Sequence, residues 1–503
     1  MLSAHSPASS PAPRRKRLIH CPSPDSPRGR AIANSAPSKQ PVGLIRGLSG
    51  WAAAAIVIGT MIGTGIFIVP ADMARTAGSV SMVALVWIVG GVLSLFGALA
   101  AAELGAALPE AGGTYAYLNH GFGPAWGFIF GWMYSILGAP TSIATISAGF
   151  MRFVSFLFPA VATPIFVWHF SLPFINHPYT FAFTWAQPGA AAAIAVVTFI
   201  NCLGVRLGGR VQVVLTIIKI AAIVAVIGIG FFLGHGSTAN FHSAASGISA
   251  AGLSGFLTAM VAALWAYDGW INLTFVGSEV KNPERNIPLA LLGGVALVCA
   301  LYVAMSAACF FVLPFSKVIA SRVIASDVIA RATGASAANW LTIAMIVCAL
   351  GTLNSSILTN ARVDYALARD GLFFRIVRGV HPRFRTPVRA LIFQAIIASL
   401  LALSGTFEDL FSLYVFTVWI FYALQTIAVF RLRSTQPNLP RPYRTWGYPV
   451  VPAIFILGAL ALTVNTCIQR PLPSAMGLVV MFSGLFFYRH WRAHPTPAET
   501  PTE

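Results

Sequence analysis

Charged residues are scarce in this chain. Only 9% of its 503 residues are Asp, Glu, Lys or Arg, whereas a soluble domain carries about 25%. So little charge cannot cover a water-facing surface of this size, which excludes a soluble enzyme and a disordered chain. Apolar residues make up 57% of the sequence and the mean hydropathy is +0.77. These values are typical of a protein that crosses a membrane several times.

Clustered metal ligands and catalytic motifs are also missing. The six cysteines show no CxxC spacing, and no Cys/His cluster has metal-ligand spacing: Cys21, Cys202, Cys299, Cys309, Cys348 and Cys467. The sequence therefore predicts separate buried thiols, with no metal and no cofactor. No HExxH, GxSxG or paired membrane aspartates occur, so we do not expect an enzyme.

Acidic residues are the scarcest charges, 14 against 32 Lys and Arg, and the net charge is +18. In a soluble protein this imbalance would suggest nucleic acid, but membrane topology explains it better. With a cytoplasmic amino terminus, 25 Lys and Arg fall in inner segments and six in outer ones. The positive-inside rule then places both termini in the cytoplasm of a multi-pass plasma (inner) membrane protein. Its surroundings would be the lipid bilayer, with no nucleic acid partner.

Apolar stretches of about 20 residues, long enough to span a bilayer as helix, recur along the chain. They do not alternate as the strands of a β-barrel would. We therefore predict an all-α polytopic membrane protein with 12 transmembrane helices. The expected spans are 49–76, 80–108, 122–158, 188–205, 211–234, 251–280, 289–315, 339–368, 389–405, 410–431, 450–469 and 475–488.

Four regions follow from this pattern. Residues 1–44 are rich in Pro, Ser and Arg and predict a disordered basic cytoplasmic tail, with an organellar transit peptide as the alternative. Residues 45–431 hold ten helices that form the transport core. Residues 432–488 add helices eleven and twelve, and 489–503 form a short cytoplasmic tail.

The first span carries small residues at mid-membrane depth, in the run Gly59-Thr-Met-Ile-Gly63-Thr64-Gly65. Glycines four apart favour close helix packing, which is one interpretation. Gly63 and Gly65, two apart, do not share a helix face, so we favour an unwound stretch. Its free N–H groups would lie at the positive end of the following half-helix and would suit a carboxylate.

The sixth span contains Asp268-Gly269 at similar depth. An Asp there costs about 2.5–3.5 kcal/mol and normally faces a cavity or a partner, and the Asp-Gly pair predicts a second break. Since spans one and six each open a set of five, we expect a 5+5 inverted repeat with discontinuous helices 1 and 6. The neighbouring Trp265 could be a gate or simple packing.

Lys219 lies within the fifth span. Snorkelling to the inner surface is one interpretation; a buried ammonium acting as a fixed or titrating cation is the other. We expect it to hold span one against span eight near Ser355 and Ser356. The charged loops 281–288 and 362–371 are either solvated or form salt bridges at an inner gate.

Six blocks of this sequence resemble a known family. They are GTMIGTGIF (59–67), PEAGGTYAYL (109–118), VQVVLTIIKIAA (211–222), ALWAYDGWINLTFVGSEVKNPERNIP (263–288), GTLNSSILTNARVDYALARDGLFF (351–374) and TPVRAL (386–391). They occur in the family's order between about residues 45 and 450. Together they resemble the amino acid–polyamine–organocation superfamily, and within it bacterial relatives of the L-type amino-acid transporters.

The resemblance implies a LeuT-type fold and alternating access. It implies that Ile62, Thr64 and Gly65 bind the substrate carboxylate or lie beside it, and the unwound stretch from Gly63 to Ile66 is where we expect the carboxylate to dock. Trp265 would stand at the aromatic gate, and Ala266 and Asp268 would line the unwound part of span six. Lys219 would occupy the place of a sodium ion in sodium-coupled relatives. Animal members of the family bond a heavy subunit through a cysteine in the external stretch that corresponds to 159–187. This chain has no cysteine there, so no disulfide-linked heavy subunit is expected.

The expected function is secondary transport of amino acids, by sodium-independent exchange of neutral L-amino acids. The alternative is a proton-coupled or broader permease that also accepts cationic substrates, because Asp268 could attract a cationic side chain. Against this, Asp268 could cap the N–H groups of the next half-helix, near Trp270. A channel would need a repeated filter motif and a sensor a soluble output domain, and the sequence contains neither.

Overall fold

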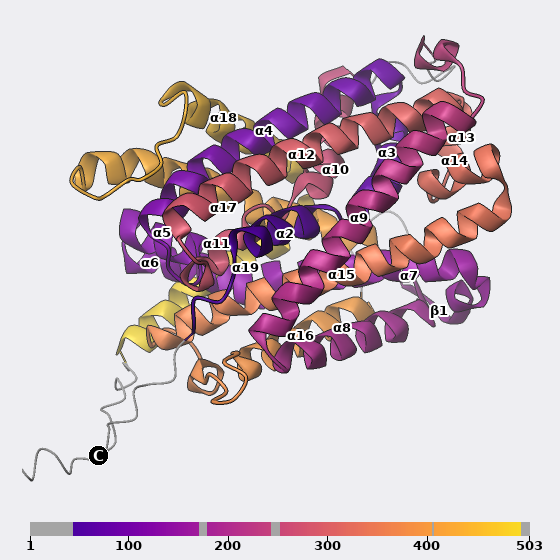
Figure 1. Ribbon diagram of the computed structural model, residues 1–503. Coiled ribbons are helices and arrows are strands. Elements are labelled where there is room, and N and C mark those ends of the chain that lie inside the picture. The colour runs from indigo at the N-terminus through magenta and orange to yellow at the C-terminus, as the bar shows by residue number, and fades with distance from the viewer. Residues whose placement is uncertain (1–43, 171–178, 243–251, 405–406, 494–503) are drawn as a thin grey trace, which may run out of the picture. The chain divides into compact units, whose positions relative to one another are not determined.

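The computed structural model describes residues 44–170, 179–242, 252–404 and 407–493 (Figure 1). The expected tail 1–44 therefore lies outside the described residues except for Leu44. The carboxy-terminal tail is helical up to Ala493, and its remainder also lies outside them.

Helices dominate the described chain, and nine helical segments in it are long and apolar enough to cross a membrane. They comprise α2 (Gly50–Met61) with α3 (Gly65–Ala77), α4 (Val80–Ala107), α6 (Pro124–Met133) with η1 (Tyr134–Gly138) and α7 (Ala139–Leu157), α9 (Val205–Leu233), α12 (Pro283–Val312), α15 (Ala335–Arg369), α17 (Phe407–Thr435), α18 (Val450–Gln469) and α19 (Pro471–Ala493). Three shorter apolar helices are α8 (Ala186–Cys202), α10 (Gly252–Tyr267) and α16 (Val388–Ser404). The expectation of a helical polytopic membrane protein is confirmed.

The connections hold short elements. They are α5 (Thr114–Phe122), α11 (Asn272–Phe275), α13 (Phe315–Ala320), α14 (Ile324–Thr333), η2 (Pro159–Ala162), η3 (Thr238–His242), η4 (Gly277–Glu279) and η5 (Arg375–Arg378). Strands β1 (Pro164–Phe170) and β2 (Tyr179–Thr184) pair antiparallel, with Val167 opposite Ala182. The all-α expectation is wrong for this hairpin, whose run of β-branched and aromatic residues favours strand.

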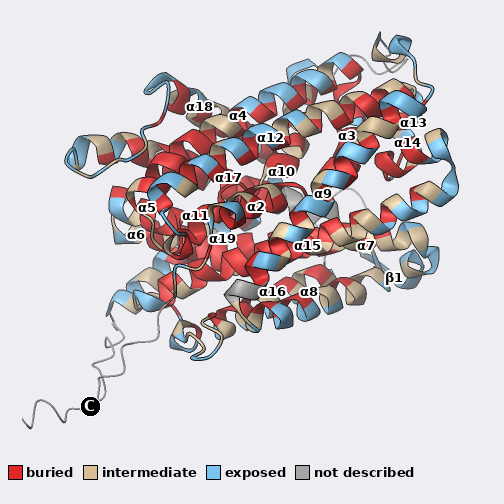
Figure 2. Cartoon of the chain, in the orientation of Figure 1, coloured by how far each residue is buried: buried red, intermediate tan, exposed pale blue. Residues whose placement is uncertain are grey.

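Helices α2, α3 and α10 lie inside the bundle. In the most apolar stretch of Gly50–Ala77, 89% of the residues are buried. In that of α19 only 17% are buried, so α19 lies at the periphery. α3 packs against α10, α2 packs against α9 and α12, and α12 runs along α4. Figure 2 shows buried residues concentrated around α2, α10 and α17.

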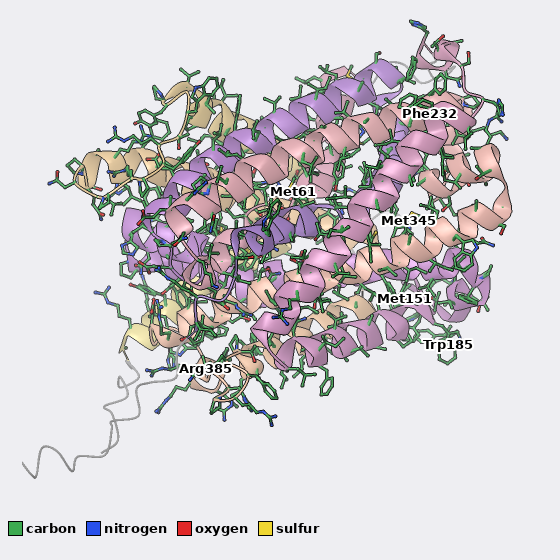
Figure 3. All side chains as sticks on the ribbon, viewed as in Figure 1. Met61, Met151, Trp185, Phe232, Met345 and Arg385 are labelled. Atoms are coloured by element: carbon green, nitrogen blue, oxygen red, sulfur yellow. The ribbon has the colours of Figure 1, made fainter. Side chains whose placement is uncertain are left out.

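The two ends of the bundle differ. Met61, at the end of α2, lies in the middle, whereas Phe232 and Trp185 lie toward one end and Arg385 toward the other (Figure 3). We call the end that carries Arg385 the basic end. There the carboxylate of Glu103, near the end of α4, accepts hydrogen bonds from Arg433 at 2.6 and 2.9 Å.

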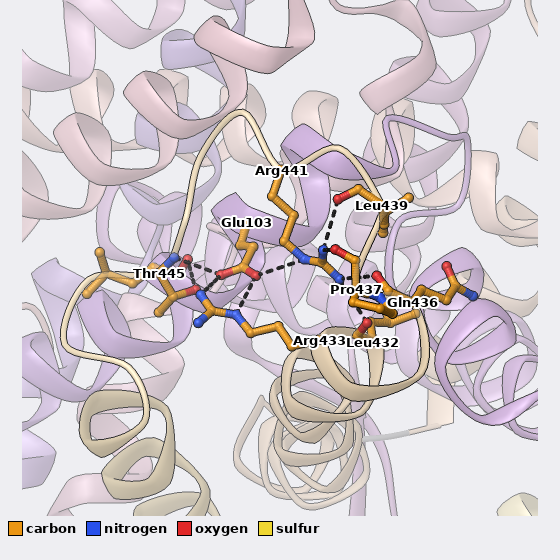
Figure 4. Close-up of polar contacts among 9 residues, drawn as sticks. Glu103, Leu432, Arg433, Gln436, Pro437, Leu439, Arg441 and Thr445 are labelled. Carbon is orange, nitrogen blue, oxygen red and sulfur yellow. Dashed lines mark hydrogen bonds and ion pairs between the residues drawn. The ribbon is translucent and has the colours of Figure 1, made fainter.

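The same carboxylate holds the loop that leads to α18 (Figure 4). It accepts from the backbone N–H of Thr445 at 2.7 Å, and the Arg441 guanidinium lies 3.6 Å away. One buried carboxylate thus joins α4, α17 and this loop. Its partners are cations and an N–H group, the donors that a buried acid requires.

Candidate functional site

The first helical span is interrupted where its glycines predict. α2 ends at Met61, Ile62 is extended (φ −72°, ψ 91°), and α3 begins at Gly65. Within the described chain, the N–H groups of Gly63, Thr64 and Gly65 donate to no backbone carbonyl. These donors lie at the amino-terminal end of the 13-residue α3, where the helix dipole favours an anion.

The sixth span is interrupted as well. α10 ends at Tyr267, Gly269 has φ +105°, which glycine adopts without steric cost, and α11 begins at Asn272. The carbonyls of Ala266 and Tyr267 receive no backbone hydrogen bond from the described residues that follow. This break therefore presents acceptors where the first one presents donors.

The two breaks touch. A Cβ atom on Gly65 would lie 3.0 Å from Cα and 3.1 Å from Cβ of Ala266, closer than ordinary van der Waals contact. A glycine facing an alanine is therefore what allows the N–H groups of one break to lie beside the carbonyls of the other.

A cavity of about 30 Å³ lies between the breaks. Its lining residues are Thr60, Met61, Gly63, Thr64, Gly65, Ser142, Ile146, Trp265, Ala266, Asp268, Gly269, Asn272, Thr352 and Ser356. One water needs about 10–15 Å³, so the cavity holds roughly two waters and must widen to admit an amino acid.

The lining contains six of the seven residues that the sequence analysis assigned to substrate. The exception is Ile62, which is fully buried and contributes its carbonyl, an acceptor for Thr352 Oγ1 at 2.9 Å. Ser142 and Ile146 of α7 and Thr352 of α15 also line the cavity, although the sequence did not predict them. A sequence signal for these residues exists in their spacing. Ser142 and Ile146 are four residues apart, as are Thr352 and Ser356, so each pair lies on one face of its helix.

Asp268 is held by two tyrosines of α17. Tyr414 donates to its Oδ2 at 2.6 Å and Tyr422 to its Oδ1 at 2.9 Å. Asp268 does not cap α11 itself, whose cap position is Ile271 without a side-chain cap, but its carboxylate also accepts from the backbone N–H of Gly269 at the break. Tyr414 and Tyr422 are eight residues apart, about two turns, so they share a face of α17. The Tyr414 ring also meets Trp265 edge-on at 5.5 Å.

Lys219 is completely buried and does not snorkel to the surface. Its ammonium donates to the carbonyl of Gly59 and to Thr352 Oγ1, each at 2.6 Å. It thus links α2 to α15, but through Thr352, one turn before the expected Ser355 and Ser356. Ser355 Oγ lies 2.9 Å from Thr60 Oγ1 instead.

The basic end beside the site is closed by a buried ion pair. Arg362 Nε lies 2.8 Å from Glu279 Oε1, and the two side chains are 1% and 0% exposed. The backbone of Leu48 pairs with the strand-like residues around Val280. The sequence allows salt bridges between the loops 281–288 and 362–371. Arg362 of the second loop does form one, but its partner Glu279 lies two residues before the first loop.

A second pair at this end is half-exposed. His120 Nε2 lies 2.9 Å from Glu110 Oε1. The hydrogen bond that His120 donates to Glu110 raises the pKa of His120 and lowers the pKa of Glu110. The pair joins the loop after α4 to α5.

Known proteins are similar in sequence to this chain over most of its length. The family model described as "Amino acid permease" matches residues 48–486. The b(0,+)-type amino acid transporter 1 of Mus musculus is 31% identical over 89% of this chain and 87% of its own length. Serine/threonine exchanger SteT of Bacillus subtilis (strain 168) is 31% identical over 90% of this chain and 96% of its own. The human cystine/glutamate transporter is 31% identical over 90% and 85%.

These relatives are transporters rather than enzymes. The match extends over both breaks, Lys219 and the buried ion pair at the basic end. The chain therefore belongs to the amino acid permease family, within the amino acid–polyamine–organocation superfamily.

Proposed function

We propose that this protein is a secondary carrier that exchanges neutral L-amino acids without sodium. The observation that carries the proposal is the pair of facing breaks, with donors at Gly63–Gly65 and acceptors at Ala266 and Tyr267. A carboxylate suits the first set and an ammonium the second. Together they match the zwitterion that all α-amino acids share.

The preference for neutral substrates follows from Asp268. Both of its oxygens already accept a hydrogen bond from a tyrosine, so the carboxylate is satisfied within the protein. A cationic side chain would have to displace these donors and lose its water. The relatives support amino acids as the substrate class, since their names include a serine/threonine exchanger and a b(0,+)-type amino acid transporter.

Sodium independence follows from Lys219. Its ammonium occupies the space between α2 and α15, bonded to Gly59 and Thr352. A fixed cation there leaves no room for a sodium ion on the same oxygens. Its positive charge stabilises these oxygens as a bound sodium ion would.

The proposed architecture has 12 spans, with a LeuT-type 5+5 inverted repeat whose first and sixth helices are discontinuous. From the excess of Lys and Arg we infer that the basic end and both termini lie in the cytoplasm and that the protein resides in the plasma (inner) membrane. A disulfide-linked heavy subunit is not expected.

Counterflow into proteoliposomes tests the carrier. Vesicles preloaded with unlabelled alanine should accumulate labelled alanine faster than empty ones, equally in sodium and in choline buffer. Equal uptake by loaded and empty vesicles would exclude an exchanger, and a need for sodium would exclude the role of Lys219.

A second candidate is a broader or proton-coupled permease that also accepts cationic amino acids. It is favoured by one observation, the carboxylate of Asp268 on the cavity wall. Strong competition by arginine for alanine uptake would support it over the neutral carrier.

A further inference from the structure

Asp364, near the end of α15, is a buried acid without partners. Its side chain is 0% exposed, and within the described residues neither carboxylate oxygen has a hydrogen-bond partner. Buried carboxylates are normally paired with a cation or with several donors, because an isolated buried charge is very costly.

The surroundings of Asp364 are polar but incomplete. The Ser135 hydroxyl, on the π-helical turn η1, is its polar neighbour, yet Ser135 Oγ also completes no hydrogen bond. Asn360, one turn before Asp364, accepts from the Tyr134 hydroxyl at 3.1 Å, while its Nδ2 has no partner. Three neighbouring side chains thus leave four polar atoms unsatisfied in one buried place.

Cations nearby are committed elsewhere. Arg362, two residues before Asp364, donates to both oxygens of Glu279, at 2.8 and 3.2 Å, and to a backbone carbonyl. Tyr134 is the titratable neighbour on η1, and no charged group of the described residues acts on Asp364. The ionised acid would therefore have no counter-charge, and the Ser135 hydroxyl would be the donor beside it.

We propose that Asp364 is a proton-binding site, uncharged while the basic end is closed and ionised when that end opens to water. A carboxylic acid buried without partners is stable only as the neutral acid, and contact with water removes this constraint. A sodium ion fits poorly, since hard cations take about six oxygens and Asn360 Oδ1 is engaged with Tyr134.

The site is connected to the substrate pocket by polar side chains. Tyr134 adjoins Tyr414, and Tyr414 donates to Asp268 at 2.6 Å. A change in the protonation of Asp364 can therefore affect the substrate pocket through these side chains. It would make the transport rate depend on cytoplasmic pH. This consequence rests on the proposed function, whereas the proton site itself does not.

The direct test is the unfolding temperature of the purified full chain between about pH 5 and pH 8. Because ionising the buried acid costs stability, the wild type should lose unfolding temperature relative to Asp364→Asn as pH rises. We expect the difference to change by roughly 2–4 °C. The control is Asp370→Asn, since Asp370 accepts from Tyr115 at 2.8 Å and pairs with Arg369. That control should not show an advantage that grows with pH.

A difference between wild type and Asp364→Asn that stays constant with pH would overturn the proton site. If Asp364→Asn does not fold, Asp364→Leu removes the acid without leaving a polar group, and the same pH comparison applies. Sodium chloride against choline chloride distinguishes a sodium ion, because an effect that follows sodium rather than pH also overturns the proposal.

Transport provides the second measurement. Exchange by the wild type should vary with internal pH, and exchange by Asp364→Asn should not. If neither protein transports amino acids but the pH-dependent difference in unfolding temperature is present, the proposed function fails and the proton site stands.

Discussion

The ammonium of Lys219 lies 2.6 Å from the carbonyl oxygen of Gly59, a residue 160 positions away in the chain. The same ammonium reaches Thr352 Oγ1, which in turn donates to the carbonyl of Ile62. The buried cation thus binds the Gly59 carbonyl directly and the Ile62 carbonyl through Thr352, on either side of the end of α2. A buried ammonium requires such acceptors, and the break supplies them.

Replacing Lys219 with Met should slow exchange more than it weakens substrate binding. A hydrogen bond to a charged group contributes about 1.5–3 kcal/mol, which corresponds to roughly tenfold or more. We therefore expect exchange to fall at least about tenfold, with a smaller change in affinity, measured by counterflow and by equilibrium binding. Thr352→Val should act in the same direction, and a double variant no slower than Lys219→Met would show that the two residues act together. A normal exchange rate in Lys219→Met would contradict this role.

Replacing Gly65 with Val should abolish substrate binding. The new side chain would collide with Ala266, 3.0 Å from the position of its Cβ, and cover the N–H groups at the start of α3. The matched control is Gly228→Val on α9, where a Cβ meets nothing within 4 Å. Binding is measured on monodisperse protein, so unchanged affinity in Gly65→Val would exclude this break as the carboxylate site.

Removing one tyrosine hydroxyl should change the substrate range. In Tyr422→Phe, Oδ1 of Asp268 loses its 2.9 Å donor, and the freed oxygen can then accept from a cationic side chain. Excess arginine should compete with labelled alanine for uptake in Tyr422→Phe and hardly at all in the wild type. Tyr443→Phe, on the loop before α18, is the control. Strong arginine competition in the wild type that disappears in Asp268→Asn would show that the neutral preference is wrong.

Replacing Glu279 with Gln should destabilise the protein strongly. It leaves the Arg362 guanidinium buried without a counter-charge, and breaking such a pair costs about 3–5 kcal/mol. The exposed pair Asp72–Arg75 on α3 offers the comparison, since surface pairs contribute about 0–1 kcal/mol. Unfolding temperatures of Glu279→Gln and Asp72→Asn should therefore differ clearly. Equal temperatures would mean that the pair at the basic end does not hold it closed.

The Glu110–His120 pair should stabilise the basic end at acidic pH. The pKa of His120 is raised by Glu110, so the contribution is fully present below about pH 6.5 and is lost as pH rises through the raised value. Because the side chains are 37% and 40% exposed, it amounts to a few tenths of a kcal/mol. Glu110→Gln should lower the unfolding temperature more near pH 6 than near pH 8, and a pH-independent effect would contradict this.

The membrane-spanning character, the positions of the helices and the two breaks can all be read from the amino-acid sequence. These features depend on local properties: hydropathy over about 20 residues and glycine within a few residues of Thr64 and Asp268. The interruption after Met61 and that after Tyr267 are therefore where the sequence predicts them.

Which side chains contact one another depends on how the helices pack, and the sequence does not predict it. Tyr414 reaches Asp268 across 146 positions and Thr352 reaches Lys219 across 133, and no local pattern contains such pairs. The partner of each polar group depends on the rotation of its helix about its axis, because a shift of one residue turns a side chain by about 100°. For this reason Lys219 meets Thr352 rather than Ser355 or Ser356. The same rotation leaves Asp364 facing Ser135 without a cation, while Arg362, two residues away, meets Glu279.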